Sequence, residues 1–239
     1  MRIGVIGTGT IATAVVRGIA GDGHQITVSA RSAANARALS EAFDNVTIAE
    51  NQAVLEASDV VLIGTTGAQA DAALGPLTFR PDHIVISLMA DLPLDHVARL
   101  VAPAEDPVML IPFPVIATGG SPVLTCPPSP TVQALVGARN LVIPFDDPAQ
   151  MAPFMAAQAT LSPALKLVAT AADWLAARSG DPAQAEAFLT ALIANSMQGA
   201  PLADSLAALD TPGGYNQRLR DHMEPGYQLL REGLDKLET

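Results

Sequence analysis

The pattern of hydrophobic and polar residues divides the chain into two parts. In the first part, short apolar runs alternate with stretches whose apolar residues recur at helical spacing. The run Asp59–Gly64 is apolar at nearly every position, which is typical of a strand buried on both faces of a parallel sheet. Strands that alternate with helices predict an α/β fold built on a doubly wound parallel sheet. The predicted strands are Ile3–Ile6, Gln25–Ala30, Val46–Ile48, Asp59–Gly64, His83–Ser87, Val108–Ile111, Val123–Thr125 and Leu141–Ile143.

The pattern changes near Asp146. From Ala149 onward the sequence is rich in alanine and leucine and has no strand-like alternation, so it predicts helices only. We therefore expect two domains, 1–147 with the sheet and 148–239 with helices alone. The predicted helices are Ile11–Ile19, Ala33–Phe43, Gln52–Ala57, Ala68–Leu74 and Leu94–Val101 in the first domain, and about 149–158, 163–178, 182–197, 200–208 and 215–236 in the second.

The helices of the second domain have wide apolar surfaces for so small a domain. Leu165, Val168, Ala172 and Leu175 form one such surface, and residues 188–193 form another. A partner subunit could cover these surfaces, which would make the protein a homodimer. Packing against the chain's own sheet domain is the alternative, and the sequence leaves both open.

A glycine-rich turn follows the first predicted strand and leads directly into a helix. Gly7 can adopt the backbone angles of a tight turn, and Gly9 removes a side chain where phosphates would approach. Ala12 replaces the third glycine of the usual pattern, where a small residue lets helix and strand pack closely. This order predicts a Rossmann-type dinucleotide site; a merely structural turn is the alternative. The predicted pyrophosphate-binding residues are Gly7, Thr8, Gly9, Thr10 and Ile11.

The end of the second predicted strand indicates which dinucleotide is bound. Folds of this type that prefer NAD usually place an Asp or Glu there to bind the ribose 2′-hydroxyl. Here Arg31 and Ser32 occupy that place, and a guanidinium beside a hydroxyl suits a 2′-phosphate. We therefore predict NADP(H) as the cofactor. The alternative is that Arg31 only begins an exposed helix.

Composition excludes several classes of partner. The net charge is −11, with only 13 Lys plus Arg, which argues against nucleic acid as a partner. A single cysteine, Cys126, excludes an internal disulfide framework and favours a cytoplasmic location. The sequence shows neither a cleavable signal layout nor an apolar run long enough to span a membrane. The four histidines have no metal-ligand spacing, so no metal site is predicted.

Five stretches of the chain resemble the pyrroline-5-carboxylate reductase family. Ile3–Ala12 is similar to that family's glycine loop, and Val28–Ser32 to its second strand with an NADP-type arginine. Asn51–Leu62 resembles the segment whose asparagine approaches the cofactor, and Ser87–Leu92 the segment that lines the nicotinamide end. Asp210–Asn216 resembles the family's Ser-Pro-Gly-Gly-x-Thr turn, which binds the substrate carboxylate before a long helix.

The resemblance implies further site residues. Asn51, Thr65, Thr66 and Met89 join the candidate cofactor-binding residues. Thr211, Gly213 and Gly214 become candidates for binding the carboxylate of a small-molecule substrate, and Asn216 for contacting the atom that gains charge. Independently of the family, a Thr-Pro-Gly-Gly sequence before a helix gathers free N–H groups that suit an anion. The alternative is an ordinary capping turn with nothing bound.

The sequence departs from the family pattern at positions expected to lie near the substrate and the reacting atoms. Asn216 stands where the family has a threonine, Phe113 replaces a polar residue of the site region, and Leu165 lies in a stretch that has lost the family's glycines. The fold and the cofactor are therefore expected to be shared, whereas the substrate is not fixed. The leading hypothesis is NADP(H)-dependent reduction of a cyclic imine, similar to pyrroline-5-carboxylate, or of a related small carboxylate.

Two alternatives stay open. Related hydroxyacid dehydrogenases use a lysine at the start of their helical domain as acid or base, and Lys166 is the candidate for that role here. A hydroxyacid-type or deazaflavin-linked NADP oxidoreductase is therefore the second enzyme hypothesis. The third hypothesis is a regulator that binds the dinucleotide without catalysis.

Overall fold

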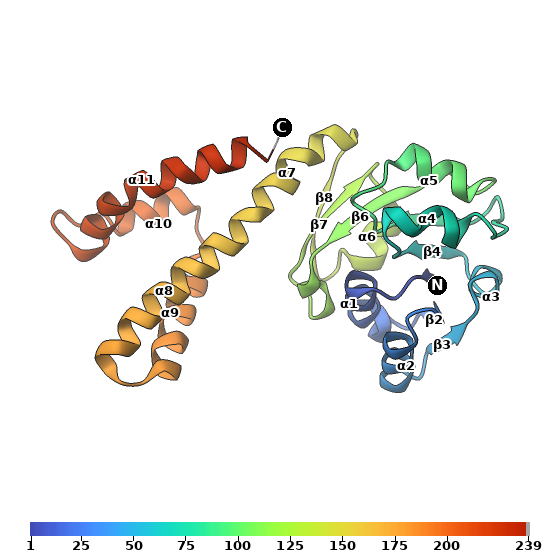
Figure 1. Cartoon of the computed structure of the whole chain (residues 1–239), viewed down its shortest axis with the longest axis horizontal. Coiled ribbons are helices and arrows are strands. Elements are labelled where there is room, and N and C mark those ends of the chain that lie inside the picture. Colours follow the sequence, from blue (N-terminus) through green and yellow to red (C-terminus); the bar gives the residue numbers. More distant parts are fainter. Residues whose placement is uncertain (238–239) are drawn as a thin grey trace. The chain divides into compact units, whose positions relative to one another are not determined.

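Eight strands form a single sheet in the first of the two compact units of the protein, which comprise Met1–Met151 and the chain from Ala152 onward. The structure is a computed structural model and describes residues 1–237 (Figure 1). The strand order is β3-β2-β1-β4-β5-β6-β7-β8, so the chain runs outward from β1 in one direction and from β4 in the other. The strands are β1 Arg2–Ile6, β2 Gln25–Ser29, β3 Val46–Ala49, β4 Val60–Ile63, β5 Ile84–Ser87, β6 Val108–Pro112, β7 Pro122–Cys126 and β8 Leu141–Pro144.

The predicted doubly wound α/β fold is confirmed, with one difference in strand direction. Strands β1 to β6 pair in parallel, whereas β7 is antiparallel to β6 and parallel to β8. The link between β6 and β7 is a short loop with one 3-10 turn, Pro114–Ala117. A parallel crossover needs a dozen or more residues, so this link returns the chain in the opposite direction.

Helices cover both faces of the sheet and build two separate cores. Alternate residues of each strand point to opposite faces, so Val60 and Leu62 belong to one core and Val61 and Ile63 to the other. Helices α1, α2 and α6 pack on the first face, and α3, α4 and α5 on the second. Their bounds are α1 Thr10–Ile19, α2 Ala33–Ala42, α3 Asn51–Glu56, α4 Gly67–Leu74, α5 Leu94–Val101 and α6 Pro130–Val136.

Helix α6 is not among the helices that the sequence predicted. Pro130 occupies the first helical position, and the Ser129 hydroxyl accepts a hydrogen bond from the N–H of Val132 at 3.3 Å. A serine followed by proline is a recognised start of a helix, so this signal was present in the sequence.

The second unit is helical throughout the described residues, and its hydrophobic side chains are mostly exposed. Only Ala172 and Ala185 are buried among residues 152–237. Helices α8 and α9 form a hairpin around Gly180, and the Asp181 carboxylate caps α9 by accepting from the N–H of Gln184 at 3.0 Å. No described helix is both long and apolar enough to cross a membrane. The helices are α7 Ala152–Ala157, α8 Leu161–Ser179, α9 Pro182–Ser196, α10 Leu202–Ala208 and α11 Tyr215–Asp235.

A buried histidine ties the start of β5 to helix α3. The ring of His83 is fully buried, accepts the N–H of Arg80 at Nδ1 (3.0 Å) and lies 3.1 Å from the carbonyl oxygen of Leu55 at Nε2. Phe79 packs against this ring edge to face, with the ring centroids 5.9 Å apart. With Nδ1 accepting, Nε2 donates to the Leu55 carbonyl, which requires the neutral ring.

Burial lowers the pKa of His83, so we expect stability to depend on pH. Below the ordinary histidine pKa of about 6.5, the unfolded chain binds a proton that the folded protein excludes, and the free energy of unfolding therefore decreases as the pH falls. Urea unfolding between pH 5 and 8 should show a weaker dependence in His83→Gln than in the wild type, with His222→Gln as a control at an exposed position. Burial also lowers the pKa of His24, so part of the pH dependence should remain in His83→Gln. Identical profiles for His83→Gln and the wild type would contradict this expectation.

Candidate functional site

The candidate cofactor-binding residues all follow the carboxyl ends of parallel strands. They come after β1 (residues 7–11), β2 (31 and 32), β3 (51), β4 (65 and 66) and β5 (89). Because these five strands are neighbours and run in the same direction, the residues lie along one edge of the sheet. The strand order reverses between β1 and β4, and open α/β sheets bind ligands in the crevice at such a switch point.

Gly7 is required by the local backbone. Its φ is +91°, a left-handed conformation that side chains rarely adopt. A Cβ atom there would also lie 2.9 Å from the carbonyl group of Gly64 and from the nitrogen of Thr65. The ends of β1 and β4 therefore approach too closely for any other residue.

Three side chains hold the glycine turn in place. The Ser29 hydroxyl, at the end of β2, accepts a hydrogen bond from the N–H of Gly7 at 2.8 Å. The carbonyl oxygen of Thr8 accepts from the side-chain amide of Asn35 at 2.6 Å and from the Thr13 hydroxyl at 3.3 Å. With its carbonyl turned toward these donors, the turn is fixed before any ligand binds.

The same turn leaves polar groups unpaired. Helix α1 has no side-chain cap, so no side chain accepts from its first N–H groups. The Thr8 hydroxyl is buried and has no hydrogen-bond partner among the described residues. A Cβ atom on Gly9 would meet only the Gly64 oxygen, at 3.7 Å, so protein packing does not require this glycine. An anion that contacts the backbone at Gly9 would account for all three features.

Ala12 takes the place of the third glycine because Gly64 makes room for it. A Cβ atom on Gly64 would lie 2.5 Å from the Ala12 methyl group and 2.7 Å from the Gly7 oxygen. The close packing of helix and strand is thus achieved by a small residue on each side.

Arg31 and Ser32 lie between β2 and α2, beside the glycine turn. Arg31 is exposed, and its guanidinium has no partner among the described residues. Ser32 precedes the first residue of α2 and makes no capping hydrogen bond with its side chain. Ser29 and Asn35, which flank Arg31 and Ser32 in the sequence, both form hydrogen bonds with the glycine turn. A 2′-phosphate bound beside that turn would therefore meet two free donors, the guanidinium of Arg31 and the hydroxyl of Ser32.

The remaining candidate cofactor-binding residues lie just after the ends of β3, β4 and β5. Asn51 is the first residue of α3 and half-buried. The Thr65 hydroxyl donates to the sulfur of Met89 at 3.2 Å, so these two predicted residues are brought together. Thr66 precedes α4 and is exposed. The carboxylate of Asp91 accepts the N–H of Gly67 at 3.1 Å and thereby caps that helix.

Sequence reasoning missed Ser29, Asn35, Gly64 and Asp91. Gly64 had a signal, since a glycine directly after an apolar strand indicates a close approach of backbones. The other three act through hydrogen bonds to backbone groups of another segment. No local pattern identifies such partners.

In the second unit, the turn before α11 is closed by one backbone hydrogen bond and by one side chain of the helix. Gly213 has a φ of +72°, and the N–H of Gly214 donates to the Thr211 oxygen at 2.9 Å. The residue that precedes α11 is Gly214, and no side chain caps this helix, so Thr211 does not act as the cap. Asn216 is exposed, and its side chain has no partner in the described part of the chain. The amide of Gln217 accepts the N–H of Gly213 at 2.7 Å.

The remaining candidate and departure residues lie on different elements. Lys166 is exposed on α8, so the described residues of this chain do not supply the burial that its predicted acid or base role requires. Leu165, next to it, is 62% exposed. Phe113 follows the carboxyl end of β6, at the same edge as Met89, and its N–H donates to the Ser121 hydroxyl at 3.1 Å. Among residues 1–237, no three acidic, histidine or cysteine side chains gather as metal ligands do.

The comparisons agree with the fold described above. Residues 2–91 match the family described as NADP oxidoreductase coenzyme F420-dependent. Among curated proteins, none matches the chain.

Several solved structures match the protein over almost its whole length. A pyrroline-5-carboxylate reductase from Streptococcus pyogenes is 19% identical, with a TM-score of 0.80 and 100% of this chain and 98% of that chain covered. The NADP-bound pyrroline carboxylate reductase of Plasmodium falciparum is 13% identical, with a TM-score of 0.82 and coverage of 100% and 95%. A reductive aminase from Aspergillus terreus, in complex with NADPH and ethyl levulinate, is 19% identical, with a TM-score of 0.55 and coverage of 98% and 94%. The chain is therefore a protein with the pyrroline-5-carboxylate reductase fold, whose N-terminal segment matches the coenzyme F420-dependent NADP oxidoreductases.

Proposed function

We propose that the protein binds NADP(H) at the carboxyl edge of its sheet and reduces the C=N bond of a small cyclic imine. The observation that supports this most is the glycine turn. Hydrogen bonds with Ser29 and Asn35 hold the turn in place, and its Thr8 hydroxyl has no partner among the described residues. The solved structures that match the fold include two pyrroline carboxylate reductases and a reductive aminase, and two of these three structures contain NADP or NADPH.

Each candidate residue has a role in this proposal. The first N–H groups of α1 and the Thr8 hydroxyl bind the pyrophosphate, and Arg31 and Ser32 bind the 2′-phosphate. The part of the cofactor that leads to the nicotinamide is contacted and oriented by Asn51, Thr65, Thr66 and Met89. When bound, NADPH supplies the hydride.

The Thr211–Gly214 turn and Asn216 are proposed to contact the substrate. As a hydride adds to the imine carbon, the electron pair of the C=N bond moves to nitrogen. The amide of Asn216 can donate a hydrogen bond to that nitrogen and so stabilise the pair. A substrate that enters as an iminium already has the proton of the product amine; a neutral imine takes it from water.

We expect Arg31→Ala to weaken NADPH binding roughly 10- to 100-fold and to leave NADH binding nearly unchanged. A hydrogen bond to a charged group contributes about 1.5–3 kcal/mol, and only NADPH has the 2′-phosphate. Fluorescence titration of both nucleotides measures the two affinities. Arg37→Ala is the matched control, because Arg37 is an exposed arginine six residues further along the chain, on α2. Equal loss of both nucleotides would mean that Arg31 does not contact the 2′-phosphate.

Turnover tests the proposed reaction. NADPH oxidation is followed with pyrroline-5-carboxylate, 1-pyrroline and a panel of keto acids, for the wild type and for Asn216→Ala. We expect turnover of a cyclic imine and a reduced rate in the variant. A protein that binds NADPH and reduces none of these compounds would support a regulator without catalysis.

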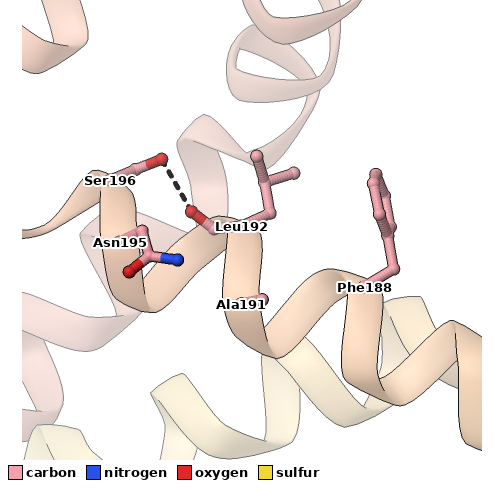
Figure 2. A pocket seen from close by; sticks show the side chains of 5 residues that line it. All are labelled: Phe188, Ala191, Leu192, Asn195 and Ser196. Atoms are coloured by element: carbon pink, nitrogen blue, oxygen red, sulfur yellow. Dashed lines mark hydrogen bonds between the residues drawn. The ribbon is translucent and has the colours of Figure 1, made fainter.

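We further propose that the protein is a homodimer joined through its helical unit. Sixteen of the twenty exposed large hydrophobic side chains of the described residues lie in that unit. On α9, Phe188 is 57% exposed and Leu192 is 51% exposed, and both point to the same side of the helix (Figure 2). Monomeric proteins rarely expose so much apolar surface, whereas a second copy can cover it.

One observation favours a second candidate function. The family matched by residues 2–91 uses coenzyme F420, a deazaflavin, so hydride exchange between that coenzyme and NADP(H) is the alternative. In that reaction, or in a hydroxyacid-type reaction, Lys166 would be the candidate acid or base once a partner copy buries it. Reduction of NADP⁺ by reduced F420, without turnover of any imine, would favour this candidate.

A further inference from the structure

The carbonyl group of Thr8, in the glycine turn, is held by a side chain of the next helix. The side-chain amide of Asn35, in the first turn of α2, donates to the Thr8 oxygen at 2.6 Å. The Thr13 hydroxyl donates to the same oxygen at 3.3 Å, but Thr13 belongs to α1, into which the turn itself leads. The bond from Asn35 therefore joins the turn to a second element of the fold.

This bond fixes the direction of the N–H group that follows. The peptide between Thr8 and Gly9 is trans, and the C=O and N–H of a trans peptide point in opposite directions. Because the Thr8 oxygen is turned toward the Asn35 amide, the N–H of Gly9 points away from that amide. In the described part of the chain, this N–H has no hydrogen-bond partner. It is therefore free to donate to a ligand.

The backbone of the turn does not enforce this orientation by itself. A flip of the Thr8–Gly9 peptide changes φ of Gly9, and glycine accepts φ of either sign. The peptide between Ile6 and Gly7 differs, because its oxygen and its N–H both have partners within the protein. A flip at Gly9 would turn a carbonyl oxygen toward the ligand in place of an N–H, which would repel an anion.

On the basis of the proposed function, we propose that Asn35 is a positioning residue for the pyrophosphate of NADP(H). By holding the Thr8 oxygen, the Asn35 amide directs the N–H of Gly9 to the phosphate oxygens and keeps the carbonyl oxygen away from them. Asn35 thus acts on the part that NADPH and NADH share. The proposed function assigns Arg31, in contrast, to the 2′-phosphate, which NADH lacks.

Helix α2 does not depend on Asn35 for its packing. Asn35 is exposed, whereas Ala36 and Leu39 of the same helix are fully buried and anchor it in the core. Alanine also has a higher helix propensity than asparagine. Asn35→Ala should therefore leave α2 intact and Arg31, which precedes the helix, in place.

The affinities of Asn35→Ala for three nucleotides test this role. NADPH and NADH contain the pyrophosphate, whereas adenosine 2′-monophosphate has a 2′-phosphate without it. We expect both dinucleotides to bind about tenfold more weakly than to the wild type, by a similar factor, because hydrogen bonds to charged groups are among the strongest. Calorimetric titration measures these two affinities. The affinity for adenosine 2′-monophosphate, measured by displacement of NADPH, should not change.

Asn45→Ala is the matched control. The Asn45 amide also holds backbone oxygens, those of Ala20 at 2.8 Å and His24 at 2.7 Å. Asn45 precedes β3, however, and so lies at the opposite edge of the sheet from the glycine turn. This variant should have a lower midpoint of thermal unfolding and unchanged nucleotide affinities. Asn35→Ala should show the reverse, which a purely structural role of Asn35 would not produce.

The outcomes separate this proposal from the proposed function. Wild-type affinity of Asn35→Ala for both dinucleotides would overturn the proposal and leave the proposed function intact. Weaker binding of NADPH with unchanged binding of NADH would assign the effect of Asn35 to the 2′-phosphate and would also overturn the proposal. A wild-type protein that binds neither dinucleotide would overturn the proposed function itself. If Asn35→Ala does not fold, Asn35→Ser, which shortens the side chain, takes its place with the same expected result.

Discussion

Replacement of Gly9 by alanine is expected to leave the protein folded and to weaken NADPH binding by at least about tenfold. The backbone of Gly9 has a φ of −69°, which alanine adopts freely, and the added methyl group would meet only the Gly64 oxygen, at 3.7 Å. Alanine is a poorer residue than glycine before a helix, but the cost is under about 1 kcal/mol. The methyl group would, however, occupy the space through which a pyrophosphate approaches the backbone.

Gly7→Ala provides the contrast. Its methyl group would meet the backbone of Gly64 and Thr65 at 2.9 Å, in a left-handed conformation, so this variant should lose stability as well as binding. Strain of this kind costs about 1–3 kcal/mol. The expected pattern in thermal unfolding and calorimetric titration is that Gly9→Ala loses affinity only, whereas Gly7→Ala loses both. Unchanged NADPH affinity in Gly9→Ala would show that the pyrophosphate does not lie on this turn.

A substitution in the helical unit is expected to have the second large effect, on the association of the protein. Leu192→Asp should convert the dimer to a monomer and lower the midpoint of thermal unfolding. Burial of a leucine stabilises by about 1.5–3 kcal/mol, and a two-fold interface contains each substitution twice. The exposed apolar face of α9 around Leu192 is shown in Figure 2. Sedimentation velocity at several protein concentrations measures the change in association.

Leu141→Asp is the matched control, because Leu141 is a 65% exposed leucine at the start of β8, in the sheet unit. It should leave the oligomeric state unchanged. A wild-type protein that is monomeric at micromolar concentration would contradict the proposed dimer. A dimer that persists in Leu192→Asp would place the interface on another face.

The sequence was sufficient to predict the order of the strands and of the helices other than α6. Apolar runs such as Val60–Ile63 and the glycines after β1 are local signals, because burial on both faces and a tight turn each restrict the residue type at a position. The predicted resemblance to pyrroline-5-carboxylate reductases is confirmed for the fold. The direction of β7 was not predicted, because it depends on the length of a loop rather than on the strand itself.

The candidate site was less accessible to sequence reasoning. Gly7 and Arg31 occupy positions defined by their distance from a strand end, so their roles could be predicted. Gln217 is the third residue of α11 and accepts the N–H of Gly213. A glutamine at this position commonly bonds back to the backbone before the helix, so this local signal was present in the sequence and was missed.

Calorimetric titration of NADPH, and separately of NADH, into the wild-type protein tests most directly whether the glycine turn binds a dinucleotide. We predict saturable binding of NADPH at one site per chain and binding of NADH that is weaker by about tenfold or more. A folded protein that binds neither nucleotide would contradict the proposed cofactor and, with it, the proposed reaction.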